Sequence, residues 1–156
     1  MTRARAQPFA WMVVGFLWLT YLLNYVDRQV VFSIFPALKR DLGFSDAQLG
    51  LVGSVFTWVY SLCMPLTGRI ADLARRDRVV VASLVLWSLA TAGTAYSFSA
   101  GAFLVWRGVM GITEALYMPA ALSLIAAMHA AGTRSKALAV HSTAQLAGIV
   151  AGGWYG

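Results

Sequence analysis

Four ionisable residues stand within long uncharged stretches of the sequence, and their types could together carry a proton and hold an anion. Asp27 and Arg28 are adjacent in the first stretch, and Arg107 and Glu114 are seven residues apart in a later one. A carboxylate can take up and release a proton, whereas a guanidinium group presents several N–H donors to an anion. The four charges sum to zero, so protonation of one acid would leave an arginine available to an anion.

The composition indicates what kind of molecule must position these charges. Of the 156 residues, 60% are hydrophobic and 12% are charged, whereas soluble domains have about 45–50% apolar and about 25% charged residues. A soluble fold of this size could not bury so much apolar surface, but a lipid bilayer would solvate it. The net charge of +6 comes from short basic clusters between the uncharged stretches, which argues against a nucleic-acid-binding face.

The uncharged stretches have the length of about 20 residues that a helix needs to cross a bilayer. We therefore expect an all-α membrane protein with about five transmembrane helices, at residues 9–35, 47–68, 79–98, 102–128 and 137–156. Pro36 is expected to close the first helix, and Pro119 to kink the fourth. Ser45 and Gln48 have the spacing of a capping box, which predicts the start of the second helix.

The lysine and arginine residues predict the orientation in the membrane. Eight of them lie on one side, at the N-terminus and after the second and fourth helices: Arg3, Arg5, Arg69, Arg75, Arg76, Arg78, Arg134 and Lys136. Only Lys39 and Arg40 lie in the connections on the other side. Cytoplasmic loops carry the excess of basic residues, so we expect a multi-pass protein of the cell (inner) membrane with its N-terminus in the cytoplasm.

The expected depths of the four charges would allow them to form a cluster. Asp27 lies about 13 Å below the outer end of the first helix and Arg107 about 10 Å below that of the fourth, so the two could meet if these helices are neighbours. Arg107 and Glu114 are two turns apart and share a face. Nearby polar residues that could add contacts are Asn24, Tyr25 and Tyr117.

Two interpretations of the four charges remain open. They could form structural ion pairs that fasten two helices together, or they could line a substrate or proton path. Each would cost about 2.5–3.5 kcal/mol unpaired at the bilayer centre, and intramembrane ionisable residues are functional by default. We therefore favour the path.

Other residues favour packing over chemistry. Gly148 and Gly152 form a G-x-x-x-G pattern that Gly156 continues, which predicts close approach of helices. His129 and His141 have no metal-binding spacing, and we expect them to be solvated or to pack. The sequence has no nucleophile elbow, P-loop, zinc-protease motif or dinucleotide fingerprint. It therefore predicts no enzyme, no cofactor, no metal site and no nucleic-acid partner.

Residues 68–78, GRIADLARRDR, resemble the loop motif G-x-L-A-D-R-x-G-R-R of the major facilitator superfamily. The matching positions are Gly68, Ala71, Asp72 and Arg76, with Ile70 conservative. The departures are Leu73, Arg75 and Asp77. The resemblance implies that Gly68, Asp72 and Arg76 belong to a gating loop, in which Gly68 allows close helix approach and Asp72 holds a helix N-terminus of the neighbouring bundle.

Further segments resemble particular branches of that superfamily. Residues 24–28, NYVDR, are similar to the first-helix motif of the anion:cation symporters and of the spinster-like lipid transporters. Residues 107–115, RGVMGITEA, are similar to their fourth helix, and residues 133–135 to the loop after it. Residues 148–153, GIVAGG, lack the proline of the antiporter motif G-P-x-x-G-G, which favours symport.

The resemblance implies a twelve-helix fold, of which this chain would supply a partial N-terminal bundle without helices 6–12. It implies a secondary active transporter, and we expect proton-coupled symport of a small organic anion such as a sugar acid. Asp27 and Glu114 would carry the proton, and Arg28 and Arg107 would bind the anion. The alternatives are a spinster-like transporter of lysolipids or other amphiphiles, and a non-transporting membrane scaffold or subunit.

Overall fold

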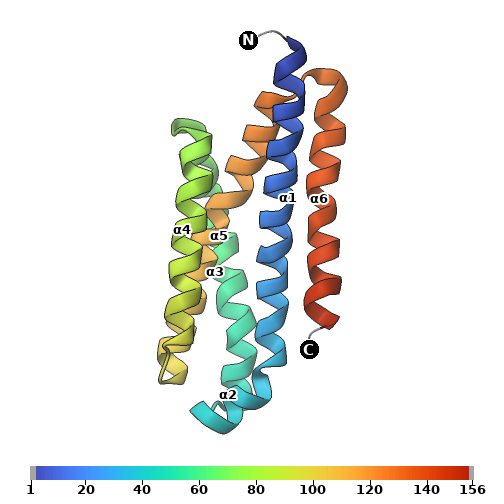
Figure 1. Cartoon of the computed structure of the whole chain (residues 1–156). Helices are drawn as coiled ribbons and strands as arrows, with labels where there is room; N and C mark the ends of the chain where they lie inside the picture. The colour runs from blue at the N-terminus through green and yellow to red at the C-terminus, as the bar shows by residue number, and fades with distance from the viewer. Residues whose placement is uncertain (1–2, 155–156) are drawn as a thin grey trace. The chain divides into compact units, whose positions relative to one another are not determined.

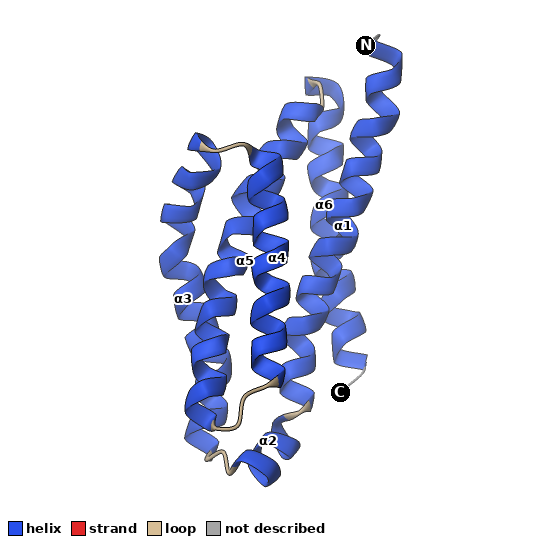
Figure 2. Cartoon of the chain, turned by 60° about the vertical axis from the view of Figure 1, so that its left-hand side comes forward, coloured by secondary structure: helices blue, strands red, loops and turns tan. Residues whose placement is uncertain are grey.

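The computed structural model describes residues 3–154, with the backbone alone for residues 3–6, and within this part of the chain the regular secondary structure is all helical, without strands. Its six helices are α1 (Arg3–Ser33), α2 (Phe35–Leu42), α3 (Asp46–Leu73), α4 (Arg76–Ala95), α5 (Ala100–Met128) and α6 (Ala131–Trp154) (Figures 1 and 2). The predicted all-α fold is confirmed. Gly156 and the side chains of Arg3 and Arg5 lie outside the described residues.

Four of these helices are long and apolar enough to cross a membrane: Gln7–Ser33 of α1, and the whole of α3, α4 and α5. The fifth predicted span corresponds to α6, whose 24 residues would measure about 36 Å. Within the described residues, α6 is not among the helices that are apolar enough to cross a membrane. Its first turns contain Arg134 and Lys136, and mostly polar residues follow at 141–145. The sequence was right that a helix forms here, and its crossing of the membrane stays a prediction.

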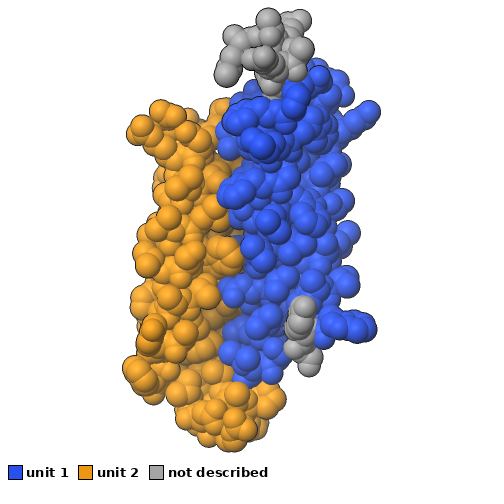
Figure 3. Space-filling view, viewed as in Figure 1, with its two compact units in different colours: residues 1–34, 122–156 blue, residues 35–121 orange. Residues whose placement is uncertain are grey.

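The chain divides into two compact units, shown in different colours in Figure 3. Unit 1 contains residues 1–34 and 122–156, which include α1, α6 and the last residues of α5. Unit 2 contains residues 35–121, which include α2, α3, α4 and most of α5. Pro119 lies inside α5, two residues before the boundary between the units, and its predicted kink stays a prediction.

Unit 1 is built on the packing of α1 against α6, which lie side by side in both ribbon views. A Cβ atom added at Gly148 would lie 2.6 Å from the carbonyl oxygen of Leu22, and one at Gly152 would lie 2.6 Å from Cβ of Gln29. The two glycines therefore let the helix backbones approach more closely than any side chain would permit. This confirms the packing role that the G-x-x-x-G pattern predicted.

Unit 2 is held together by a similar close contact between α3 and α5. A Cβ atom added at Gly111 would lie 2.8 Å from the carbonyl oxygen of Phe56 and 3.1 Å from the backbone nitrogen of Tyr60. Beside this contact, Phe56, Ala90 and Met110 form a buried apolar cluster that joins α3, α4 and α5. This cluster supports the segment of α5 that carries Arg107.

The connection after α1 differs from the loop that the sequence predicted. The helix α1 ends at Ser33, and Pro36 is the second residue of the short helix α2, not the residue that closes α1. A proline is tolerated in the first turn of a helix, where its missing N–H would have no helical partner. Leu38 of α2 is buried, whereas Lys39 and Arg40 are exposed.

The start of α3 follows the predicted capping box. The hydroxyl oxygen of Ser45 accepts a hydrogen bond from the backbone N–H of Gln48 at 3.3 Å. The Gln48 side-chain oxygen accepts in return from the backbone N–H of Ser45 at 2.9 Å. Two of the amides that a helix start leaves unpaired are thus satisfied, and the prediction is confirmed.

Candidate functional site

The helix α1 carries four of the predicted site residues within five positions. Asn24 is buried, and Tyr25, Asp27 and Arg28 are half-buried. The guanidinium carbon of Arg28 lies 4.7 Å from the centre of the Tyr25 ring. Since the face of an aromatic ring attracts a cation, Tyr25 holds one face of the Arg28 side chain.

A series of ring contacts supports Tyr25 from the side of α6. Tyr21 meets Tyr25 edge to face, with 5.0 Å between ring centres and an angle of 89°. Tyr21 also stacks on His141 of α6 at 4.8 Å and 8°, and its hydroxyl donates to the side-chain oxygen of Gln145 at 3.4 Å. The sequence did not predict this set, although His141 packs, as one of its two expected roles.

Arg107 is held in unit 2 by groups of α3. Its side chain is 2% exposed, and its Nε donates to the carbonyl oxygen of Val52 at 3.3 Å. Its guanidinium carbon lies 4.8 Å from the centre of the Phe56 ring. A buried arginine needs such partners because its charge loses contact with water, and they fix the direction in which the guanidinium group points.

Glu114 and Tyr117 lie on the same buried side of α5 as Arg107. Glu114 is 2% exposed, and Tyr117 is also buried. The spacing of seven residues places Glu114 about 10 Å from Arg107 along the helix axis. A carboxylic acid and a guanidinium group thus share the interior face of one helix.

Comparisons with known proteins identify the family to which this chain belongs. The family model described as Major Facilitator Superfamily matches residues 17–156. The chain belongs to the major facilitator superfamily. Protein spinster homolog 1 of Homo sapiens is 32% identical over 133 residues, which cover 83% of this chain and 25% of that protein.

Two further relatives of this superfamily member are informative. The probable sulfoacetate transporter SauU of Cupriavidus necator is 30% identical over 140 residues, which cover 89% of this chain and 33% of that protein. A crystal structure of a bacterial homolog to the human lysosomal transporter spinster, inward-facing and unoccupied, matches with a TM-score of 0.88 at 28% identity. The matched residues cover 93% of this chain and 30% of the chain in that crystal structure.

These comparisons confirm the resemblance and the fold class that the sequence predicted. The superfamily and its spinster members are membrane-spanning transporters and not enzymes. The chain spans between a quarter and a third of the length of the relatives it matches.

The superfamily motif at residues 68–78 lies at the junction of α3 and α4. Gly68 and Asp72 belong to the last turns of α3, and Arg76 is the first residue of α4, so most of the expected loop is helical. No atom lies within 4 Å of a Cβ atom added at Gly68, and both Asp72 and Arg76 are exposed. This surface is open within the described part of the chain.

Two of the three departures from the motif, Arg75 and Asp77, form an ion pair of their own. The guanidinium group of Arg75 donates to a carboxylate oxygen of Asp77 at 2.8 Å. This hydrogen bond lowers the pKa of Asp77 and raises the pKa of Arg75. Both side chains are exposed, so the pair contributes little to stability, and its charges cancel at the start of α4.

The predicted site residues therefore fall into two groups. Asn24, Tyr25, Asp27 and Arg28 are together on α1 in unit 1, whereas Arg107, Glu114 and Tyr117 are together on α5 in unit 2. The meeting of Asp27 with Arg107 across the two units stays a prediction. Among the described residues, no three His, Cys, Asp or Glu side chains gather as a metal site would require.

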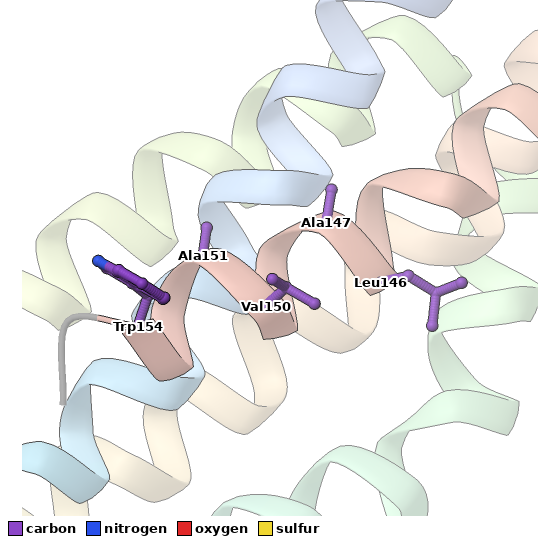
Figure 4. Close-up of a pocket in the computed structure, with 5 residues that line it drawn as sticks. All are labelled: Leu146, Ala147, Val150, Ala151 and Trp154. Atoms are coloured by element: carbon purple, nitrogen blue, oxygen red, sulfur yellow. The ribbon is translucent and has the colours of Figure 1, made fainter.

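A shallow apolar groove of about 550 Å³ runs along α6 within unit 1. Figure 4 shows the residues that line it: Leu146, Ala147, Val150, Ala151 and Trp154. None of these five lining residues is charged, so they offer no group that would bind an anion or carry a proton.

Proposed function

We propose that this chain is the N-terminal part of a secondary active transporter that carries a small organic anion, such as a sugar acid, together with protons. One observation carries the proposal. Two residues of opposite charge, Arg107 and Glu114, are buried on α5, a helix apolar enough to cross a membrane. Such groups are costly in a bilayer and mark substrate or proton paths.

The proposed coupling uses both charged groups. Asp27 and Glu114 carry the proton, while Arg28 and Arg107 bind the anion. Protonation of an acid removes a negative charge that competes with the substrate for the arginine, so proton and anion load together. Three polar residues would complete the binding site: Asn24, Tyr25 and Tyr117.

The gate is proposed to lie at the superfamily motif. The open surface at Gly68 has room for a neighbouring helix, and the exposed carboxylate of Asp72 can meet the positive N-terminus of such a helix. Arg76 lies beside it at the start of α4. The partner would come from helices 6–12, which we propose lie in the same longer protein.

The choice of substrate rests on the relatives. The name of the Cupriavidus necator protein mentions sulfoacetate, a small organic anion, and this supports the leading proposal. The spinster relatives and the matching crystal structure support the second candidate, a transporter of lysolipids or other amphiphiles, because the first-helix motif at residues 24–28 also resembles that of the spinster-like lipid transporters. A non-transporting membrane scaffold is the third candidate, in which the charges only fasten helices.

The proposed location is the cell (inner) membrane with the N-terminus in the cytoplasm. It rests on the split of eight basic residues on one side against two on the other. The exposed Lys39 and Arg40 of the minority side are each neutralised by an aspartate, Asp46 at 2.6 Å and Asp41 at 2.7 Å.

A transport experiment on the full reading frame separates the candidates. Proteoliposomes that contain the protein would be given labelled sulfoacetate, labelled sugar acids or a labelled lysolipid, each with and without an inward proton gradient. We expect accumulation of an anion only with the gradient. Transport of the lysolipid alone would favour the second candidate, and transport of none of them would favour the scaffold.

A further inference from the structure

A chain of stacked side chains leads from the middle of α6 to Arg28. His141 is completely buried and stacks on Tyr21, Tyr21 and Tyr25 meet edge to face, and the guanidinium group of Arg28 lies over the Tyr25 ring. We refer to these four residues as the Arg28 stack. All four belong to unit 1, and α1 and α6 lie side by side in Figures 1 and 2.

The spacing along α1 aligns the stack. Tyr21, Tyr25 and Arg28 are separated by four and then three residues, so they lie on one face of the helix. Each side chain is then in position to limit the rotamers of the next. What holds Tyr21 at the other end therefore contributes to the orientation of Arg28.

The helix α6 holds both tyrosines at successive turns. His141 covers the face of the Tyr21 ring, and one turn later Gln145 accepts the hydrogen bond of the Tyr21 hydroxyl. One turn further, Gly148 leaves room for Tyr25, whose Cβ lies 2.6 Å from where a Cβ atom of residue 148 would be. These contacts leave little freedom for either ring.

We propose that His141 is a positioning residue that, through Tyr21 and Tyr25, holds the Arg28 guanidinium group in the orientation that receives the transported anion. The role of Arg28 in this statement rests on the proposed function. His141 is completely buried, so it acts through its flat ring against Tyr21 and not by touching the anion. Fixing an arginine before binding removes the entropy cost of ordering it later.

The alternative is that His141 merely fills space between α1 and α6, which any side chain of similar size would do. Substitution by two residues of similar volume separates the two roles. His141→Phe keeps a flat ring that can stack on Tyr21, whereas His141→Leu fills the space without one. Thr143→Val is the matched control, because it removes the hydrogen bond from Trp18 to Thr143 at 2.9 Å, which also joins α1 to α6 outside the stack.

The first readout needs no substrate. Phenylglyoxal modifies exposed arginines, and mass spectrometry of the full-length protein in liposomes gives the rate at Arg28 and at Arg107 separately. We expect His141→Leu to speed the modification of Arg28 about threefold or more, since a cation held on a ring is released. His141→Phe and Thr143→Val should leave that rate unchanged. Arg107, which α3 holds, should react at the same rate in all variants.

The second readout is the KM for uptake of labelled sulfoacetate. We expect His141→Leu to raise KM about threefold with little change in the maximal rate, and His141→Phe to restore the KM of the unmodified protein. If the unmodified protein transports no sulfoacetate, this anion is the wrong substrate, but the modification of Arg28 still tests the stack. The two proposals can therefore fail separately.

Several results would overturn the proposal. One is that Arg28 reacts with phenylglyoxal at the same rate in His141→Leu as in the protein without substitutions. Another is that His141→Phe or Thr143→Val speeds this reaction as much as His141→Leu does. If both arginines react faster in His141→Leu, the variant has lost its fold. The comparison then moves to the half-buried Tyr25, where Tyr25→Phe should keep Arg28 slow and Tyr25→Leu should not. Equal rates in this second pair would overturn the proposal.

Discussion

Glu114 is the residue on which the proposed proton coupling depends most directly. Glu114→Gln resembles the protonated acid in shape and charge, so the full-length variant should still bind the anion and exchange it across the membrane. A gradient of one pH unit drives about tenfold accumulation of the anion per proton. In the variant, the ratio of inside to outside concentration should fall to about one, which means no accumulation. Counterflow and gradient-driven uptake of labelled anion in proteoliposomes measure the two activities.

The matched control for this variant is Asp46→Asn, which removes a carboxylate that is exposed and paired with Lys39. It should keep gradient-driven accumulation, because it lies at the start of α3 and outside the proposed site. If Glu114→Gln also concentrates the anion on a proton gradient, the proton is carried elsewhere, and the four charges would then be structural ion pairs.

Anion binding should depend on the shape of the Arg107 side chain as well as on its charge. Arg107→Ala is expected to abolish anion binding, and to lower stability by roughly 1–3 kcal/mol because the contacts with Val52 and Phe56 are lost. Arg107→Lys keeps the charge but not the planar group that lies over Phe56, so it should bind weakly and remain folded. Binding assays and thermal unfolding measure the two effects, and normal binding by Arg107→Ala would exclude this residue from the site.

At the scale of the elements, the contact between α1 and α6 depends on Gly148. Gly148→Ala would place a Cβ atom 2.6 Å from a backbone oxygen of α1, so the helices must separate, at a cost of about 1–3 kcal/mol. Gly153→Ala is the control, because it lies on the same helix and the added Cβ atom would meet no atom of another part of the described chain within 4 Å. Thermal unfolding in detergent should show a lower midpoint for position 148 only, and equal midpoints would contradict the packing.

The elements also show which parts of the fold could be predicted from sequence. The capping box at Ser45 and the packing at Gly148 and Gly152 were predicted because each is a local pattern whose physical role is the same in any helix. The short helix α2 was missed, because a search for spans of about 20 residues reads its charged residues as a loop. Sequence therefore predicted the long helices better than the short helix between them.

The residue types of the candidate site could be proposed from the sequence, but the contacts that hold these side chains could not. Charges inside uncharged stretches marked Asp27 and Glu114 as candidates without any knowledge of the fold, and their role stays a prediction. The stack of His141 on Tyr21 joins residues 120 positions apart, and it depends on the register between α1 and α6. No pattern within one helix indicates how two helices align, so neither this contact nor the hydrogen bond from Arg107 of α5 to the Val52 carbonyl of α3 could be predicted.

For the whole molecule, the basic residues predict that Arg75 and Arg76 face the cytoplasm and Lys39 the outside. Single cysteines placed at positions 39 and 76 in a Cys63→Ala background test this in intact cells with an impermeant maleimide. We expect labelling at position 39 alone, and labelling at both positions after the cells are opened. Labelling at position 76 but not at position 39 in intact cells would reverse the orientation.

Residues 1–156 expressed alone are expected not to transport, because the relatives they match are three to four times longer. The groups on α5, Arg107 and Glu114, would then lack the opposite wall of the cavity, and the open surface at Gly68 and Asp72 would lack its partner helix. Co-expression with the remainder of the reading frame as a separate chain should restore uptake in proteoliposomes. Uptake by residues 1–156 alone would contradict this prediction and indicate that several copies assemble into a small transporter, with charges from different copies completing one path.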